Sequence, residues 1–188
     1  MRIRLRIFVV QIAVLLCVAA SLQATTLARL SLDQLAAAAD AVARVRCTSV
    51  ESRWENGEIW TVTSFDVVET LKGALPGRIT VRLPGGRVGH LTATVDGTPK
   101  FMAGEEAVVF LEKSRAGELS VAAWVEGTFR IGRELRTGIE TVTQDSSSFA
   151  VFDMATRTFR TEGIRRMPME QFRERVATAL TRTQERIR

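Results

Sequence analysis

The sequence predicts a mostly β protein built as a small, closed or nearly closed antiparallel barrel, with a short helix before it and another after it. Segments rich in β-branched residues recur at a spacing of about ten residues with turn signals between them. The longest segment, residues 60–73, is apolar at odd positions such as Phe65 and Val67 and at even positions such as Val62 and Val68. A strand with this mixed parity buries both faces or bends, as barrel strands do.

The first 24 residues have the pattern of a signal peptide. Three arginines among the first six residues precede an apolar run over residues 7–20, and small residues follow up to Ala24. An uncleaved membrane anchor is the alternative, but the apolar run falls short of the roughly 20 residues that a spanning helix needs. We therefore expect residues 25–188 to form a single soluble domain, secreted or periplasmic, with no transmembrane segment.

Removal of this segment changes the charge of the chain. The whole sequence has 26 basic and 21 acidic residues. Residues 1–24 hold three arginines and no acid, so 23 basic and 21 acidic residues remain, a net charge of +2. The high pI of the whole chain therefore gives no reason to expect a nucleic-acid partner. The arginines gathered in residues 157–188 are expected to form the solvated face of a terminal helix.

The expected elements begin with a short helix. Ser31 and Gln34 have the spacing of a capping box, and the helix should run to about Asp40. A strand should follow from residue 41 to residue 54, with a bulge near Thr48 where its apolar parity shifts. Asn56-Gly57 then predicts a tight hairpin turn into the long strand at residues 60–73.

The second half of the chain supplies the strands that close the sheet and the terminal helix. The unbroken apolar run at residues 107–111 indicates a central strand covered on both faces. An i, i+4, i+8 apolar stripe, Phe172, Val176 and Leu180, predicts a docking helix. The expected segments are strands at 78–83, 90–95, 105–112, 119–125 and 128–131, an irregular hairpin or loop region at 132–163, and a C-terminal helix at 168–186 with Pro168 in its first turn.

Residues that support catalysis are scarce. After residue 24 only Cys47 remains, and its alternating context places it in the core as a small hydrophobe rather than a reactive thiol. The single histidine, His90, cannot build a multi-histidine metal site, and no nucleophile elbow accompanies it. The glycine-rich loop at residues 84–89 matches no phosphate-binding pattern. We expect no enzyme activity, no metal site and no cofactor.

Four residues form the candidate binding surface. Trp54 borders the predicted hairpin turn and Trp60 follows it, so the two indoles are expected to form a cross-strand pair near the loop. Arg87 and His90 lie in and just after the glycine-rich loop, where they can meet an anionic partner. The sequence thus predicts a binding site at Trp54, Trp60, Arg87 and His90.

The layout of residues 31–131 resembles a group of uncharacterised exported bacterial proteins. It also resembles the netrin-like module of tissue inhibitors of metalloproteinases, through the strand ending in Lys72-Gly73 and the Gly104-Glu105-Glu106 segment before an apolar strand. That resemblance implies an OB-type barrel with a terminal helix. The inhibitors use a cysteine at the mature amino terminus, whereas this chain is expected to start near Thr25. We therefore expect a non-catalytic binding or protein-interaction module with a protein or cell-envelope partner, the alternative being a secreted protease inhibitor of netrin-like fold.

Overall fold

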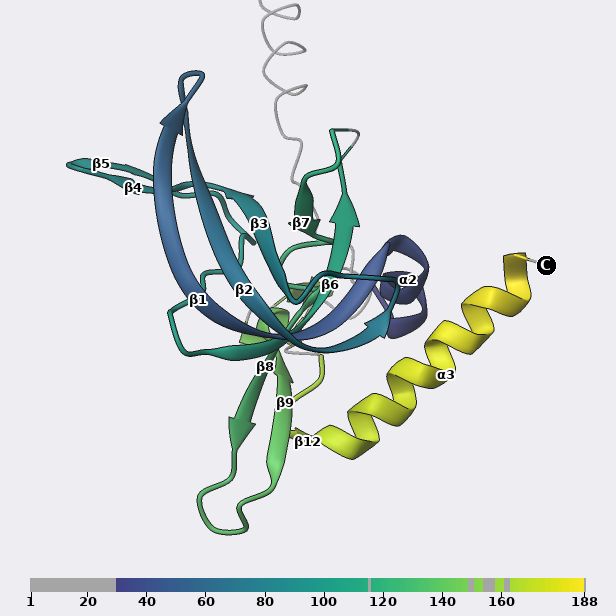
Figure 1. Ribbon diagram of the computed structural model, residues 1–188. Coiled ribbons are helices and arrows are strands. Elements are labelled where there is room, and N and C mark those ends of the chain that lie inside the picture. The colour runs from purple at the N-terminus through teal and green to yellow at the C-terminus, as the bar shows by residue number, and fades with distance from the viewer. Residues whose placement is uncertain (1–29, 115, 149–150, 154–157, 161–162, 188) are drawn as a thin grey trace, which may run out of the picture.

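The computed structural model describes residues 30–114, 116–148, 151–153, 158–160 and 163–187 (Figure 1). The predicted signal peptide, residues 1–24, lies outside the described residues. The described part is mostly β, with five strands closed in a ring, a short helix before the ring and a long helix at the C-terminal end. The predicted mostly β, barrel-like class with a helix at each end is confirmed.

Two neighbouring strands of the ring, β3 and β7, run parallel, which the sequence did not predict. The strand order is β1-β2-β3-β7-β6, and β6 pairs back to β1. All of these pairings are antiparallel except β3 with β7, which is parallel over the single pair Val81–Leu119. Strand direction cannot alternate all the way around a ring of five, because five is odd. The strands are β1 (Ala41–Glu55), β2 (Glu58–Lys72), β3 (Arg78–Pro84), β6 (Glu106–Lys113) and β7 (Leu119–Val121).

Strands β1 and β2 form a long hairpin. The pairing shifts register between Cys47 and Ser49, which confirms the predicted bulge. Asn56 and Gly57 both have positive φ, 50° and 88°, the conformation of a two-residue turn whose twist matches that of the strands. The predicted turn is therefore confirmed, and the hairpin is regular up to its tip.

Strand β6 lies between two apolar clusters. Alternate residues of β6 point to opposite faces, so Val109 and Leu111 face the interior of the ring while Val108 and Phe110 face the helices. The interior cluster also contains Val45, Cys47, Phe65, Ile79, Val81, Leu83, Phe101 and Val121. The unbroken apolar run thus marks a strand covered on both faces, as predicted.

The two helices cover the other cluster. Helix α2 (Leu32–Ala38) begins with the predicted capping box of Ser31, and it ends before the predicted Asp40 because Ala39 is already extended. Helix α3 (Met169–Ile187) buries Phe172, Val176 and Ala179. Pro168 pairs with Thr141 in the short strand β12 (Met167–Pro168) and does not sit in the first helical turn. Neither helix of the described part is both long and apolar enough to cross a membrane.

The strand expected at 119–125 is shorter than predicted. It ends at Val121, because Ala123 and Trp124 have positive φ and a Cβ on Gly127 would lie 2.0 Å from the carbonyl oxygen of Ala122. In the region expected to be an irregular hairpin or loop, strand β9 (Glu140–Gln144) pairs with β8 (Thr128–Arg133) and leads into a 3-10 turn (Asp145–Ser148).

Three short hairpins project from or lie beside the ring. The β8–β9 hairpin points away from the end that carries the β1–β2 tip (Figure 1). The second hairpin joins β4 (Gly86–Val88) to β5 (Leu91–Ala93), and the third joins β10 (Val151–Asp153) to β11 (Thr158–Arg160). The β1–β2 tip and the β8–β9 tip thus lie at opposite ends of the molecule (Figure 1).

Candidate functional site

The β1–β2 hairpin extends beyond the ring and leaves one edge of β1 open. Strand β6 pairs with β1 only over residues 41–46, whereas β2 pairs with β1 as far as Glu55. Over residues 48–55, no described strand pairs with the edge of β1 that faces away from β2. An unpaired strand edge presents backbone N–H and C=O groups to any chain that can approach it.

The register shows which backbone groups face this open edge. Glu55 and Glu58 flank the two-residue turn and form a hydrogen-bonded pair, and hydrogen-bonded and non-hydrogen-bonded pairs then alternate along the hairpin. Trp54 therefore belongs to a non-hydrogen-bonded pair with Ile59. In agreement, the carbonyl of Ile59 points away from β1 and accepts from Gly85 N–H at 2.8 Å. By the same alternation, Val50, Ser52 and Trp54 direct their N–H and C=O groups to the open edge.

The side chains of the same three residues share one face of β1, and a cavity lies beneath two of them. The cavity has a volume of about 240 Å³, and Val50 and Ser52 line it. Its other apolar walls come from β3, from β5 and from the loop that follows β5: Leu83, Pro84, Ala93, Val95, Pro99 and Phe101. Val50 is 42% exposed although it lies on the interior side, so the cavity is open toward the edge of β1.

Two threonine hydroxyls in the wall of this cavity have no partner. Thr63 is fully buried in β2 and Thr98 lies in the loop after β5. Neither Oγ1 atom makes a hydrogen bond within the described part of the chain. A buried hydroxyl without a partner costs about 1–3 kcal/mol of stability, and a native structure holds few such groups. A ligand with a polar group would satisfy them.

Three of the four predicted site residues come from this end of the ring. Trp54 is 54% exposed and shares the face of Val50 and Ser52. Arg87 and His90 are exposed on the β4–β5 hairpin, which crosses the β1–β2 hairpin where Arg87 N–H donates to Ser52 Oγ (Figure 1). Within the described residues, neither Arg87 nor His90 forms an ion pair.

Trp60 does not belong to this surface. It pairs with Arg53, one position away from the Trp54–Ile59 pair, so the two indoles point to opposite faces of the hairpin and the predicted Trp54–Trp60 pair is wrong. The Arg82 guanidinium lies over the Trp60 ring, 4.4 Å from its centroid. The two-residue turn sets this relation, because Glu55 opposite Glu58 places Trp54 opposite Ile59 and Trp60 opposite Arg53.

Sequence reasoning missed the residues that build the cavity. Val50, Ser52, Thr63 and Thr98 carry no motif, and their meeting depends on the bulge and on the loop after β5. One signal was present: Ser52, Thr61 and Thr63 are hydroxyl residues at facing positions of two neighbouring strands. Small hydroxyl residues on the inner face of a barrel end leave space that larger side chains would fill.

Cys47, the one thiol considered for catalysis, does not line the cavity beside β1. Cys47 is buried, and burial, followed by the charge of Glu105, raises the pKa of its thiol. It packs inside the ring, as the sequence predicted. In the part of the chain that the structure describes, no group of three His, Cys, Asp or Glu side chains is placed to hold a metal ion. The mature amino terminus, on which the protease-inhibitor alternative depends, lies outside the described residues, so that alternative stays a prediction.

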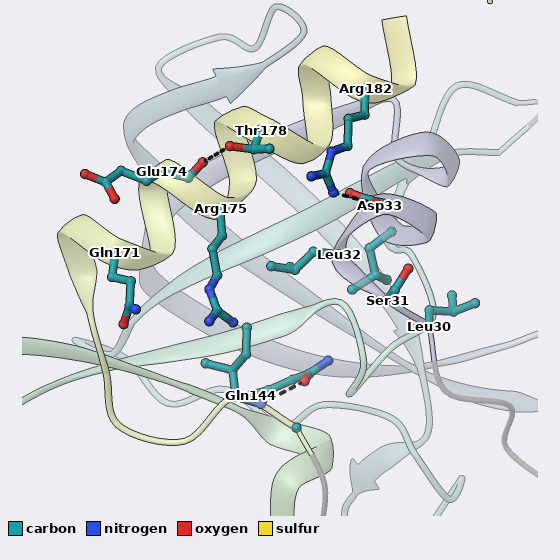
Figure 2. A pocket seen from close by; sticks show the side chains of 13 residues that line it. Leu30, Ser31, Leu32, Asp33, Gln144, Gln171, Glu174, Arg175, Thr178 and Arg182 are labelled. Atoms are coloured by element: carbon teal, nitrogen blue, oxygen red, sulfur yellow. Dashed lines mark hydrogen bonds and ion pairs between the residues drawn. The ribbon is translucent and has the colours of Figure 1, made fainter. Parts of the chain in front are cut away.

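A larger hollow of about 740 Å³ lies between α2 and α3 (Figure 2). Most of its polar side chains already have hydrogen-bond or ion-pair partners. Arg182 lies 3.5 Å from Asp33, Gln144 donates to Glu126, and Thr178 donates to a carbonyl of its own helix. Figure 2 shows Arg175 reaching from α3 toward Gln144. Because its polar groups are mostly satisfied, this hollow is a weaker candidate than the cavity beside β1.

No protein-family model and no curated protein matches the sequence. The function proposed below rests on the open edge of β1 and the cavity beside it.

Proposed function

We propose that this protein is an exported, non-catalytic interaction module that binds an extended polypeptide segment of a partner along the open edge of β1. One observation carries the proposal: the edge groups of Val50, Ser52 and Trp54 lie beside a cavity with two unpartnered hydroxyls, Thr63 and Thr98. The N-terminal signal pattern supports a secreted or periplasmic location.

The geometry suits the addition of a strand. A peptide that lies along β1 can form main-chain hydrogen bonds with the three edge residues, and these bonds give affinity without regard to sequence. Alternate peptide side chains would face the cavity, which gives specificity. A dry cavity of about 150 Å³ accommodates benzene, so 240 Å³ suits one aromatic or branched aliphatic side chain. Trp54 would cover the neighbouring position of the peptide.

The arrangement of strands supports an OB-like assignment within this proposal. An OB-type barrel has five strands and binds ligands on the face of strands 2 and 3 and at the loop between strands 1 and 2. The ring described above has five strands. The cavity lies against β2 and β3, and the open edge leads to the β1–β2 turn. We therefore propose an OB-like barrel that uses the usual binding face of that architecture.

A peptide selection tests the proposal. Protein starting at Thr25 would be used to select linear dodecapeptides from a random library, and one enriched peptide would be synthesised for calorimetric titration. Val50→Pro removes one N–H from the open edge, and Val50→Ala truncates the same side chain while keeping that N–H. We expect Val50→Pro to weaken binding at least about tenfold, the order of one or two lost hydrogen bonds, and Val50→Ala to weaken it less. Equal affinities for both variants, or no enriched peptide, would contradict the proposal.

A further inference from the structure

The β8–β9 hairpin ends in a rigid loop with an apolar apex. Backbone hydrogen bonds join Glu134 N–H to the carbonyl of Ile139 at 2.9 Å and Gly138 N–H to the carbonyl of Glu134 at 2.8 Å. These bonds fix the loop at both ends, yet Leu135 at its apex is 103% exposed and Ile139 is 50% exposed. The apex therefore displays a leucine that nothing in the described part of the chain covers.

The two carboxylates of the hairpin differ in their contacts. Glu134 accepts from the hydroxyl of Thr137 at 2.6 Å. Glu140 accepts two hydrogen bonds from Arg44 of β1, each 3.1 Å long. Glu140 at the base is thus held by Arg44, whereas Glu134 in the loop is exposed and offsets part of the positive charge around it.

Arginines dominate the outer surface of the hairpin. Arg133, Arg136 and Arg166 are exposed and line a hollow of about 650 Å³ beside the hairpin, together with Glu134 and Leu135 of the loop. Arg133 has only a distant contact with Glu140, at 3.7 Å, and neither Arg136 nor Arg166 forms an ion pair within the described residues. Three exposed arginines thus face one exposed carboxylate, Glu134, and the outer surface has a net positive charge around an apolar apex.

We infer that the β8–β9 hairpin is a contact surface for a membrane that contains anionic phospholipids. An exposed apolar side chain at a convex apex gains by entering the acyl boundary, and arginines around it meet the headgroups. A convex tip is poorly matched to the flat surface of a folded partner, whereas a bilayer deforms around it. The hairpin points away from the β1–β2 tip (Figure 1), so a protein attached in this way would present the open edge of β1 away from the bilayer.

Vesicle sedimentation tests this inference. Protein starting at Thr25 keeps every described helix and strand and lacks the apolar run at 7–20, which would itself bind lipid. We expect it to bind vesicles of phosphatidylglycerol and phosphatidylcholine at least about tenfold more tightly than vesicles of phosphatidylcholine alone, and to be released by salt. Leu135→Ser should weaken binding about tenfold. Arg136→Gln should weaken it about fivefold, the order of one basic residue at an anionic surface.

Matched changes elsewhere on the surface serve as controls. Leu91→Ser alters an exposed leucine of the β4–β5 hairpin, Arg78→Gln alters an exposed arginine of β3, and both should leave vesicle binding unchanged. Equal binding to both vesicle types, or unchanged binding of Leu135→Ser, would overturn the inference. Release by millimolar glycerol phosphate would assign the arginines to a soluble anion instead. If polyglutamate releases the protein from vesicles, and Leu135→Ser binds polyglutamate as tightly as the unaltered protein does, the arginines would be assigned to an acidic protein partner.

Discussion

The hydroxyl of Ser52 in β1 accepts a hydrogen bond from the backbone N–H of Arg87 in β4, with an N–Oγ distance of 3.2 Å. Ser52 Oγ also lies 3.0 Å from Thr61 Oγ1, which donates to the carbonyl of Gly85 at 2.6 Å. Since Thr61 uses its proton on Gly85, Ser52 donates to Thr61. A continuous chain of hydrogen bonds thus fastens the start of β4 across the β1–β2 hairpin, next to the proposed binding edge.

Gly86 is the residue that allows this close crossing. A Cβ at this position would lie 2.3 Å from both Ser52 Oγ and Thr61 Oγ1, and the φ of Gly86 is +131°. We predict that Gly86→Ala lowers the free energy of unfolding by roughly 1–3 kcal/mol and speeds amide exchange in residues 85–93. Gly89→Ala is the control, because Gly89 also has positive φ but no atom within 4 Å of the added Cβ. If both changes lower the free energy of unfolding equally in chemical denaturation, β4 does not cross the β1–β2 hairpin as closely as described.

Thr63 provides a test that separates stability from binding. Its Oγ1 is buried without a partner in the described structure, so Thr63→Val should raise the free energy of unfolding by about 1 kcal/mol while weakening the selected peptide. Thr128→Val is the matched control. Thr128 is equally buried, but its hydroxyl donates to the carbonyl of Trp124 at 3.0 Å, so this change should destabilise the protein. A loss of stability in Thr63→Val would mean that its hydroxyl is already satisfied.

Acid should weaken the fold through Arg44 and its two carboxylates. The hydrogen bond from Arg44 lowers the pKa of Glu140 below its ordinary 4.5, against a smaller opposing effect of burial. For Glu106, burial raises the pKa, but the bonds from Arg46 and Arg44 together outweigh it, so its pKa is also lowered. Because the folded pKa values lie below the ordinary value, this stabilisation is complete above about pH 4.5 and is lost as the pH falls further.

Chemical denaturation between pH 7 and pH 3 measures this loss. Glu140→Gln should be less stable at pH 7 and should lose less stability below pH 4.5 than the unaltered protein. Glu58→Gln removes a carboxylate that forms no ion pair within the described residues and should leave the pH dependence as it was. The same acid response in Glu140→Gln and the unaltered protein would argue against a role for this ion pair.

Cys47 should report unfolding. It is 1% exposed, and burial raises the pKa of its thiol, so both access and thiolate formation are suppressed in the folded protein. In protein starting at Thr25, Cys47 is the single cysteine. At pH 8, a disulfide reagent should label Cys47 completely in denatured protein. We predict that it leaves Cys47 of the folded protein unlabelled over the same time. Rapid labelling of the native protein would place Cys47 at the surface.

The features set by local sequence were predictable, and those set by contacts between distant residues were not. The capping box at Ser31, the Asn56-Gly57 turn and the two-sided burial around Val109 all follow from neighbouring residues. The cavity-facing position of Val50 depends on the bulge between Cys47 and Ser49, because a one-residue change of register reverses the side chains of β1 beyond it. The opposite facing of Trp54 and Trp60, by contrast, follows from the predicted two-residue turn and could have been read from the sequence.

The same distinction holds for the candidate site. Trp54 was predictable as an exposed aromatic near a turn. The cavity was not, because Thr63 and Thr98 meet only through the loop after β5. The pairing of β9 with β8 was also missed; it brings Arg130 within 2.8 Å of Asp145, a contact that the polar tract at residues 144–148 does not reveal.

Residue-resolved amide hydrogen exchange with and without the selected peptide tests the central claim most directly. If the peptide adds as a strand to the open edge of β1, the amides of Val50, Ser52 and Trp54 should gain protection, while those of Glu51 and Arg53, already bonded to β2, should change little. Protection confined to another surface, or equal protection of all five amides, would contradict the binding of an extended segment at this edge.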